Sequence, residues 1–104
     1  MTDPTNKIPH LLGITLDSNG VATSQVTIFN RNTGEYQTKA TDANKVVIFD
    51  AAEFTSGYSA SDVIDIQNVG ASVGHSTITI NSATGDFQEA TLTCAAAATA
   101  AITL

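Results

Sequence analysis

Four short runs rich in Asn, Asp, Gly and Ser divide this chain into segments of about the length of a strand. They are residues 17–20 (DSNG), 30–34 (NRNTG), 42–45 (DANK) and 82–86 (SATGD). Residues of these types favour tight turns, and glycine adopts positive φ angles at no steric cost. Such regular punctuation is typical of a sandwich or a barrel. It predicts an all-β fold.

Between the turns, apolar and polar residues alternate with the period of two that a half-buried strand requires. Val26 and Ile28 share one face of their segment, and Ile64 and Ile66 share one face of theirs. The strands predicted in this way cover residues 11–16, 21–29, 35–41, 46–49, 61–68, 75–80 and 87–104. We therefore expect a β-sandwich of about seven strands. A chain of 104 residues suits one such domain, over residues 11–104, preceded by a flexible arm over residues 1–10.

Two segments depart from simple alternation. Residues 46–49 (VVIF) are uninterruptedly apolar, which predicts a central strand covered on both faces. Residues 87–104 are rich in alanine, which favours a helix, but their threonines and the preceding turn favour a strand. We expect a strand there, at a sheet edge or in contact with another chain.

The sequence Thr-Gly-acid-aromatic occurs twice, at residues 33–36 and 84–87. In both copies the glycine can supply a positive φ angle and the aromatic residue can start the next strand. We interpret the two copies as similar hairpin turns and not as an internal duplication.

Charge and composition exclude several classes of partner. Ten Asp and Glu residues stand against four Lys and Arg residues, and the formal net charge is −6. Nucleic acids and anionic membranes need clustered cations, so neither is expected as a partner. The first nine residues lack the apolar stretch of a secretory signal, and no run has the length of a membrane span. We expect synthesis in the host cytoplasm.

Few residues here suit catalysis or metal binding, and their spacing is poor. His10 and His75 lie far apart in the sequence and are expected at the surface or in turns. The single cysteine, Cys94, is expected to be a small buried residue and not a nucleophile. The carboxylates around residues 50–61 could attract calcium, but the Asp-x-Asn-x-Asn-Gly pattern is missing and a solvated charged surface is the simpler explanation. We expect no enzyme, cofactor or metal.

The order of several motifs resembles that of a known family. Residues 13–20 read Gly-x-x-x-Asp-x-Asn-Gly, residues 26–30 read VTIFN, and residues 38–44 read TKATDAN before the apolar run 46–49. This resembles the carboxypeptidase-regulatory-like, transthyretin-like domains, which are immunoglobulin-like β-sandwiches. Lys45 stands where that family prefers glycine. The resemblance covers roughly residues 12–80.

The resemblance implies a non-catalytic module of the kind that tailed viruses place on capsids or tails. We therefore expect a virion structural protein, a head decoration or another virion-surface subunit, which contacts the major capsid protein or another virion protein and associates with copies of itself. Its expected protein-contact residues are apolar positions beside the arm, namely Ile8, Pro9, Leu11 and Leu12. The alternative is an accessory module that binds carbohydrate or another ligand through the loop 54–61, with Tyr58 as a stacking surface.

Overall fold

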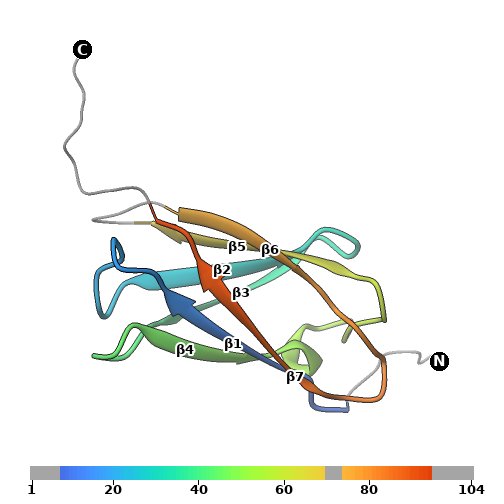
Figure 1. Cartoon of the computed structure of the whole chain (residues 1–104). Helices are drawn as coiled ribbons and strands as arrows, with labels where there is room; N and C mark the ends of the chain where they lie inside the picture. Colours follow the sequence, from blue (N-terminus) through green and yellow to red (C-terminus); the bar gives the residue numbers. More distant parts are fainter. Residues whose placement is uncertain (1–7, 70–73, 95–104) are drawn as a thin grey trace.

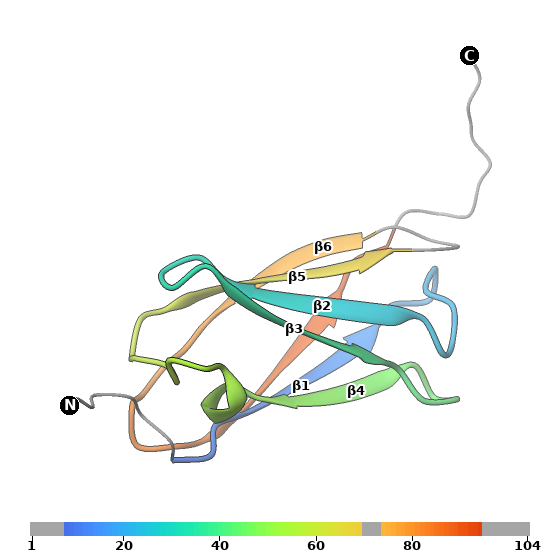
Figure 2. The same cartoon turned by 180° about the vertical axis from the view of Figure 1, so that it is seen from behind.

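The computed structural model describes residues 8–69 and 74–94 as a two-layered β-sandwich. A three-stranded sheet has the order β4-β1-β7, and a four-stranded sheet has the order β3-β2-β5-β6. The two sheets lie one over the other in Figure 1 and, seen from behind, in Figure 2. The elements are β1 (Leu11–Leu16), β2 (Gln25–Asn30), β3 (Glu35–Ala40), β4 (Val46–Asp50), the 3-10 turn η1 (Ala51–Glu53), β5 (Val63–Val69), β6 (Gly74–Thr79) and β7 (Phe87–Leu92). The predicted all-β sandwich of about seven strands is confirmed.

Each sheet joins segments that are distant in the sequence. In the three-stranded sheet β1 is central, antiparallel to β4 and parallel to β7, so that Leu11 lies opposite Asp50 on one side and Phe87 on the other. In the four-stranded sheet all three pairings are antiparallel. The parallel pairing brings the beginning of the described chain beside its end. In the described residues no helix is long and apolar enough to span a membrane.

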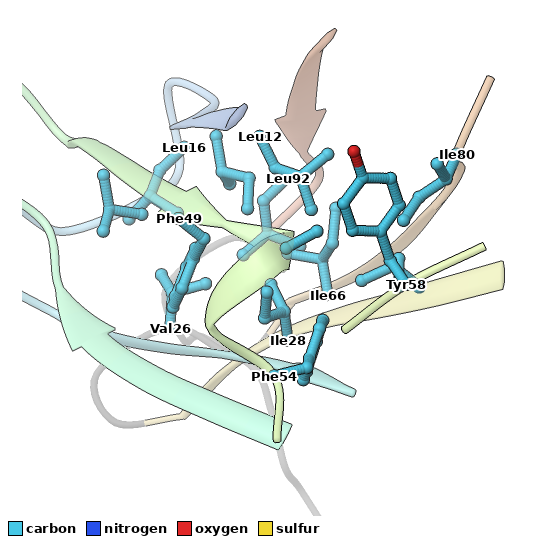
Figure 3. Packing of buried hydrophobic residues seen from close by; sticks show 14 of the residues in the cluster. Leu12, Leu16, Val26, Ile28, Phe49, Phe54, Tyr58, Ile66, Ile80 and Leu92 are labelled. Atoms are coloured by element: carbon cyan, nitrogen blue, oxygen red, sulfur yellow. The ribbon is translucent and has the colours of Figure 1, made fainter. Parts of the chain in front are cut away.

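The core lies between the two sheets and comes from both of them (Figure 3). The predicted inward faces are confirmed, because Val26, Ile28, Ile64 and Ile66 are all fully buried. Their partners from the other sheet and the loops include Leu12, Ile14, Leu16, Phe49, Phe54, Tyr58, Ile80 and Leu92. Burial of these apolar side chains is the main force that holds the sheets together.

The prediction that residues 46–49 form a central strand covered on both faces is wrong. β4 is an edge strand of the three-stranded sheet. Val47 and Phe49 are buried, whereas Ile48 between them is 47% exposed. The strand therefore alternates like its neighbours, and its outward positions happen to carry apolar residues.

The two Thr-Gly-acid-aromatic sequences do not form two similar hairpins. Both glycines have positive φ, 78° at Gly34 and 91° at Gly85, as predicted. The first sequence closes the hairpin between β2 and β3. The second connects β6 to β7, which belong to different sheets. A shared local conformation thus serves two different connections.

One predicted strand begins earlier than the observed one, and another can be compared only over its described residues. The strand predicted over 21–29 begins only at Gln25, because Val21 to Ser24 form a turn in which Thr23 has a positive φ angle. The strand predicted over 87–104 is observed as β7, with a further isolated bridge between Gly74 and Cys94. The alanine-rich residues 95–104 lie outside the described residues.

Lys45 occupies a backbone conformation that suits glycine. Its φ angle is 67°, in a turn where the Asp42 carboxylate accepts hydrogen bonds from the backbone N–H groups of Asn44 and Val46. A residue with a Cβ atom in this left-handed region destabilises the fold by about 1 to 2 kcal/mol. Glycine would avoid this strain, but it makes the unfolded chain more flexible, which offsets part of the gain.

We therefore expect Lys45→Gly to raise the free energy of unfolding by about 0.5 to 1 kcal/mol. Urea denaturation of the variant measures this. Lys45→Ala is the control for loss of the charge and should remain close to the original protein. Equal stability of the two variants would contradict the conformational explanation.

Candidate protein-contact surface

The outward side of the three-stranded sheet carries a group of exposed apolar residues. The register places Gly13 of β1 opposite Ile48 of β4, and Leu11 opposite Phe87 of β7. Leu11 is 36% exposed, and Ile48 and Phe87 are each 47% exposed. We call Leu11, Gly13, Ile48 and Phe87 the outer apolar face. It belongs to the sheet nearest the viewer in Figure 1.

Phe87 is held in place by the glycine beneath it. A Cβ atom built on Gly13 would lie 2.9 Å from Cζ and 3.1 Å from Cε1 of the Phe87 ring. The ring therefore rests on the backbone of β1 at Gly13, two residues along from its register partner Leu11. An aromatic side chain packed in this way presents its other side to a partner at little cost in side-chain entropy.

Residues 8–10 are fixed beside this face. The Tyr58 hydroxyl donates to the backbone oxygen of Ile8 at 2.7 Å, and the His10 backbone N–H donates to the Asp50 carboxylate at 3.1 Å. A Cβ atom on Gly85 would lie 2.7 Å from the backbone oxygen of Pro9. Of the arm expected over residues 1–10, residues 1–7 lie outside the described part.

Three of the four predicted contact residues are at the surface. Ile8 is 49% exposed, Pro9 is exposed, and Leu11 belongs to the outer apolar face. Leu12 points in the opposite direction and is fully buried in the core, since neighbouring residues of a strand face opposite sides. Ile48, Phe87 and Gly13 were not singled out by the sequence.

Two pairs of facing sheet edges are linked by side chains. At one side of the sandwich, Gln37 and Lys39 of β3 donate to the backbone oxygens of Asp50 and Ile48 in β4, each at 3.0 Å. At the other side, Ser76 of β6 donates to the Thr91 oxygen and Gln88 of β7 donates to the Thr79 oxygen. These bonds occupy edge carbonyl groups that an added strand would need. The outer faces are therefore better contact surfaces than the edges.

Gly34 and Gly85 provide a test of how the segment 8–10 is held. Both need a positive φ angle, but a Cβ atom meets nothing within 4 Å at Gly34 and meets Pro9 and Ile8 at Gly85. We expect Gly34→Ala to lower the free energy of unfolding by about 1 kcal/mol and Gly85→Ala by about 2 kcal/mol. Thermal and urea denaturation of both variants measure the difference. Equal losses would show that the contact with residues 8 and 9 adds no stability.

A second surface cluster lies on the outward side of the four-stranded sheet. Arg31 donates two hydrogen bonds to the Asp65 carboxylate, at 2.6 and 2.7 Å, and the His75 Nε2 atom lies 3.0 Å from the same carboxylate. Phe29 lies opposite Tyr36 in the adjacent pair, and Tyr36 is 69% exposed. This is a rigid aromatic and charged surface, but its carboxylate is already occupied by its own chain.

The hydrogen bonds from Arg31 lower the pKa of Asp65 below its usual value of 3.8, partial burial opposes them, and the bond to His75 adds to the lowering. A folded-state pKa below the unfolded value means that Asp65 stabilises the fold at neutral pH. This contribution disappears as the pH falls through and below about 4.

We expect Asp65→Asn to destabilise the protein at pH 7 and to have a smaller effect at pH 3. Urea denaturation of both proteins at the two pH values measures the difference between them. A difference of the same size at both pH values would contradict a role for the charged Asp65–Arg31 pair.

The prediction that His10 lies at the surface or in a turn is wrong. Its side chain is fully buried, Nε2 lies 2.7 Å from Oε1 of Gln88, and the ring packs against Tyr58 at 5.1 Å between centroids. Gln88 Oε1 also accepts the Asn81 backbone N–H, so it acts as an acceptor and His10 Nε2 donates. His75 is exposed and bonds Asp65, so the two histidines do not share a site.

The loop from residue 50 to residue 61 is built around structural hydrogen bonds. Asp50 caps η1 by accepting from the Ala52 N–H. Phe54 and Tyr58 are buried, so the stacking surface expected on Tyr58 is not at the surface. In the described residues no three His, Cys, Asp or Glu side chains are grouped to hold a metal, and no pocket is found. Cys94 is buried, as predicted.

Searches of known family models, of curated proteins and of solved structures found no match to this chain.

Proposed function

We propose that this chain is a non-catalytic structural protein of a virus particle, a head decoration or another subunit of the virion surface. The resemblance of its motifs to transthyretin-like modules supports this proposal, and so does its compact β-sandwich. The chain would be made in the host cytoplasm and reside in the virion, with the major capsid protein or another virion protein as the partner.

The outer apolar face is the observation that carries the proposal. Scattered apolar residues are normal on a protein surface, but a contiguous group on one rigid sheet marks a contact site. Here Leu11, Ile48 and Phe87 lie on adjacent strands, and the exposed Ile8 lies beside the turn that leads into β7. Contact sites of this kind concentrate their binding energy in a few anchors, often aromatic. Phe87 is the expected anchor.

The polar groups that might otherwise suggest chemistry have structural partners. His10 donates to Gln88 inside the fold, Asp65 binds Arg31, and Asp62 accepts from Asn30 and Ser59. These bonds are those of a stable scaffold. They support a binding role more directly than an acid–base role.

The experiment is quantitative mass spectrometry of purified particles from cells that express the chain together with the particle genes. We expect tens to hundreds of copies per particle. Phe87→Ser should lower the copy number at least tenfold, because it removes the anchor without touching the core. Tyr36→Ser, which changes an exposed aromatic residue on the other sheet, is the matched control and should leave the copy number unchanged. Absence of the chain from particles would overturn the proposal.

One observation favours the alternative of a ligand-binding module. The expected site around Tyr58 is buried, but Tyr36 and Phe29 form an exposed aromatic pair beside Thr27 and Thr38. Saccharides stack on aromatic rings of this kind while hydroxyl groups bind their rims. Titration of soluble oligosaccharides against the full chain, followed by Tyr36→Ala, tests this alternative. If an oligosaccharide binds and Tyr36→Ala abolishes the binding, the ligand-binding function becomes the favoured proposal.

A further inference from the structure

Carboxylates border the outer apolar face on its β7 side. Asp86 and Glu89 stand on either side of Phe87 in the sequence, and Glu89 Cγ would lie 3.8 Å from a Cβ atom on Gly13. Glu89 is exposed, and within residues 8–69 and 74–94 no hydrogen bond or ion pair occupies its carboxylate. The partner-facing side of β7 therefore alternates an aromatic anchor with a negative charge.

Asp86 is fixed in its charged form beside the anchor. Its Oδ1 atom accepts the Phe87 backbone N–H at 2.8 Å and its Oδ2 atom accepts from Asn81 at 3.1 Å. These two bonds lower the pKa of Asp86, the bond from Phe87 being the larger cause. The carboxylate thus keeps its charge and its position at neutral pH.

The described cations lie away from this border. Arg31 is paired with Asp65 on the other sheet. Lys39 of β3 donates to the Ile48 oxygen at the edge of β4, and its ammonium group lies 5.6 Å from the centroid of the Phe49 ring. Lys45 lies in the turn before β4. Strands β1, β4 and β7 contain Asp50 and Glu89 and no Lys or Arg. The whole chain has a net charge of −6.

We propose that the outer apolar face binds a protein segment that presents apolar side chains bordered by lysine or arginine, with the exposed Glu89 facing those cations and Asp86 adding negative charge next to Phe87. The inference rests on the proposed function and names the chemistry of the partner. A second copy of this chain is the wrong occupant, because it would bring further carboxylates against Asp86 and Glu89. Any association between copies would use another surface.

Charges at the border of an interface act mainly on the rate of association and on its dependence on salt. The apolar face should supply most of the affinity, and the carboxylates should select a basic partner. The two contributions can therefore be separated by different variants.

The test is an NMR titration of the isotope-labelled full chain with a short synthetic peptide that alternates lysine with leucine. We expect amide shifts to concentrate at Gly13, Ile48, Phe87 and Glu89, and the dissociation constant to rise about tenfold between low and physiological ionic strength. Peptides with glutamate in place of lysine, or serine in place of leucine, should bind at least tenfold more weakly. Equal binding of the glutamate peptide, or shifts centred on the four-stranded sheet, would overturn the inference.

Variants separate this inference from the proposed function. Glu89→Gln should weaken binding of the lysine–leucine peptide about threefold and flatten its salt dependence, whereas Glu53→Gln, which removes the same charge from η1, should change neither. If particle incorporation is lost in Phe87→Ser but does not respond to Glu89→Gln or to salt, the face is correct and the basic partner is wrong. If particle incorporation survives Phe87→Ser, the outer apolar face is not the contact with the particle, whether or not the peptide binds to it. A dimer that Phe87→Ser dissolves in sedimentation analysis would make the second copy the occupant and overturn the inference.

Discussion

Phe49→Ala is expected to lower the free energy of unfolding by about 3 to 5 kcal/mol, because it removes a large, fully buried side chain from between the sheets. Ile48→Ala, one residue earlier in β4, is expected to cost less than about 1 kcal/mol, because Ile48 faces outward. The Phe49 ring also makes a cation–π contact with the ammonium group of Lys39, and losing this contact adds to the destabilisation expected for Phe49→Ala.

Equilibrium urea denaturation of the two variants, followed by far-ultraviolet circular dichroism, measures both values. If Phe49→Ala is too unstable to purify, Phe49→Leu should still cost about 1 to 2 kcal/mol and serves in its place. Comparable losses at positions 48 and 49 would mean that β4 is covered on both faces, as its sequence predicted, and would contradict the exposed outward position of Ile48.

β4 illustrates where sequence patterns reach their limit. Alternation identifies the inward Val26 and Ile28 of β2 and Ile64 and Ile66 of β5, because polar residues such as Thr27 and Asp65 lie between them on the outward side. In Val46–Asp50 the outward Ile48 is as apolar as the inward Phe49, so the pattern contains no information about direction. The direction follows from the pairing of Phe49 with Leu12 in β1, a contact between residues far apart in the chain.

The candidate contact surface was predictable only in part. Ile8, Pro9 and Leu11 were recognisable as apolar residues beside the first strand, and the period of two would have excluded Leu12 once Leu11 faced outward. Phe87 joins them through the parallel pairing of β1 with β7, which no local pattern encodes. The available signal was weaker: Phe87 shares its face with the polar Glu89 and Thr91, where an apolar residue is out of place.

His10 was misplaced for a similar reason. Histidine is found both in cores and at surfaces, and the apolar residues on either side of His10 do not by themselves show which way its ring faces. Its partners Tyr58 and Gln88 come from the loop after η1 and from β7. Long-range pairing brings these groups together around residue 10, and burial of the ring follows from it.

Asp62 joins the β2–β3 turn to the loop before β5. Its carboxylate accepts hydrogen bonds from two groups of the same chain. Its Oδ2 atom accepts from Asn30 Nδ2 at 2.9 Å and from the Ser59 backbone N–H at 2.8 Å. Asp62 is almost fully buried and Asn30 is fully buried. Removing the carboxylate would therefore leave buried donors without an acceptor, and water could not easily replace it.

We expect Asp62→Ala to lower the free energy of unfolding by about 3 kcal/mol. Asp62→Asn keeps the shape and one acceptor oxygen, so its loss should be about half as large. Asn30→Ala combined with Asp62→Ala should cost less than the sum of the single changes, because each single change leaves the other partner unsatisfied. Urea denaturation of the three variants and of Asn30→Ala alone completes the cycle. Strictly additive losses would mean that the two side chains stabilise the fold independently, and the Asp62–Asn30 bond would then not be what ties the turn to the loop.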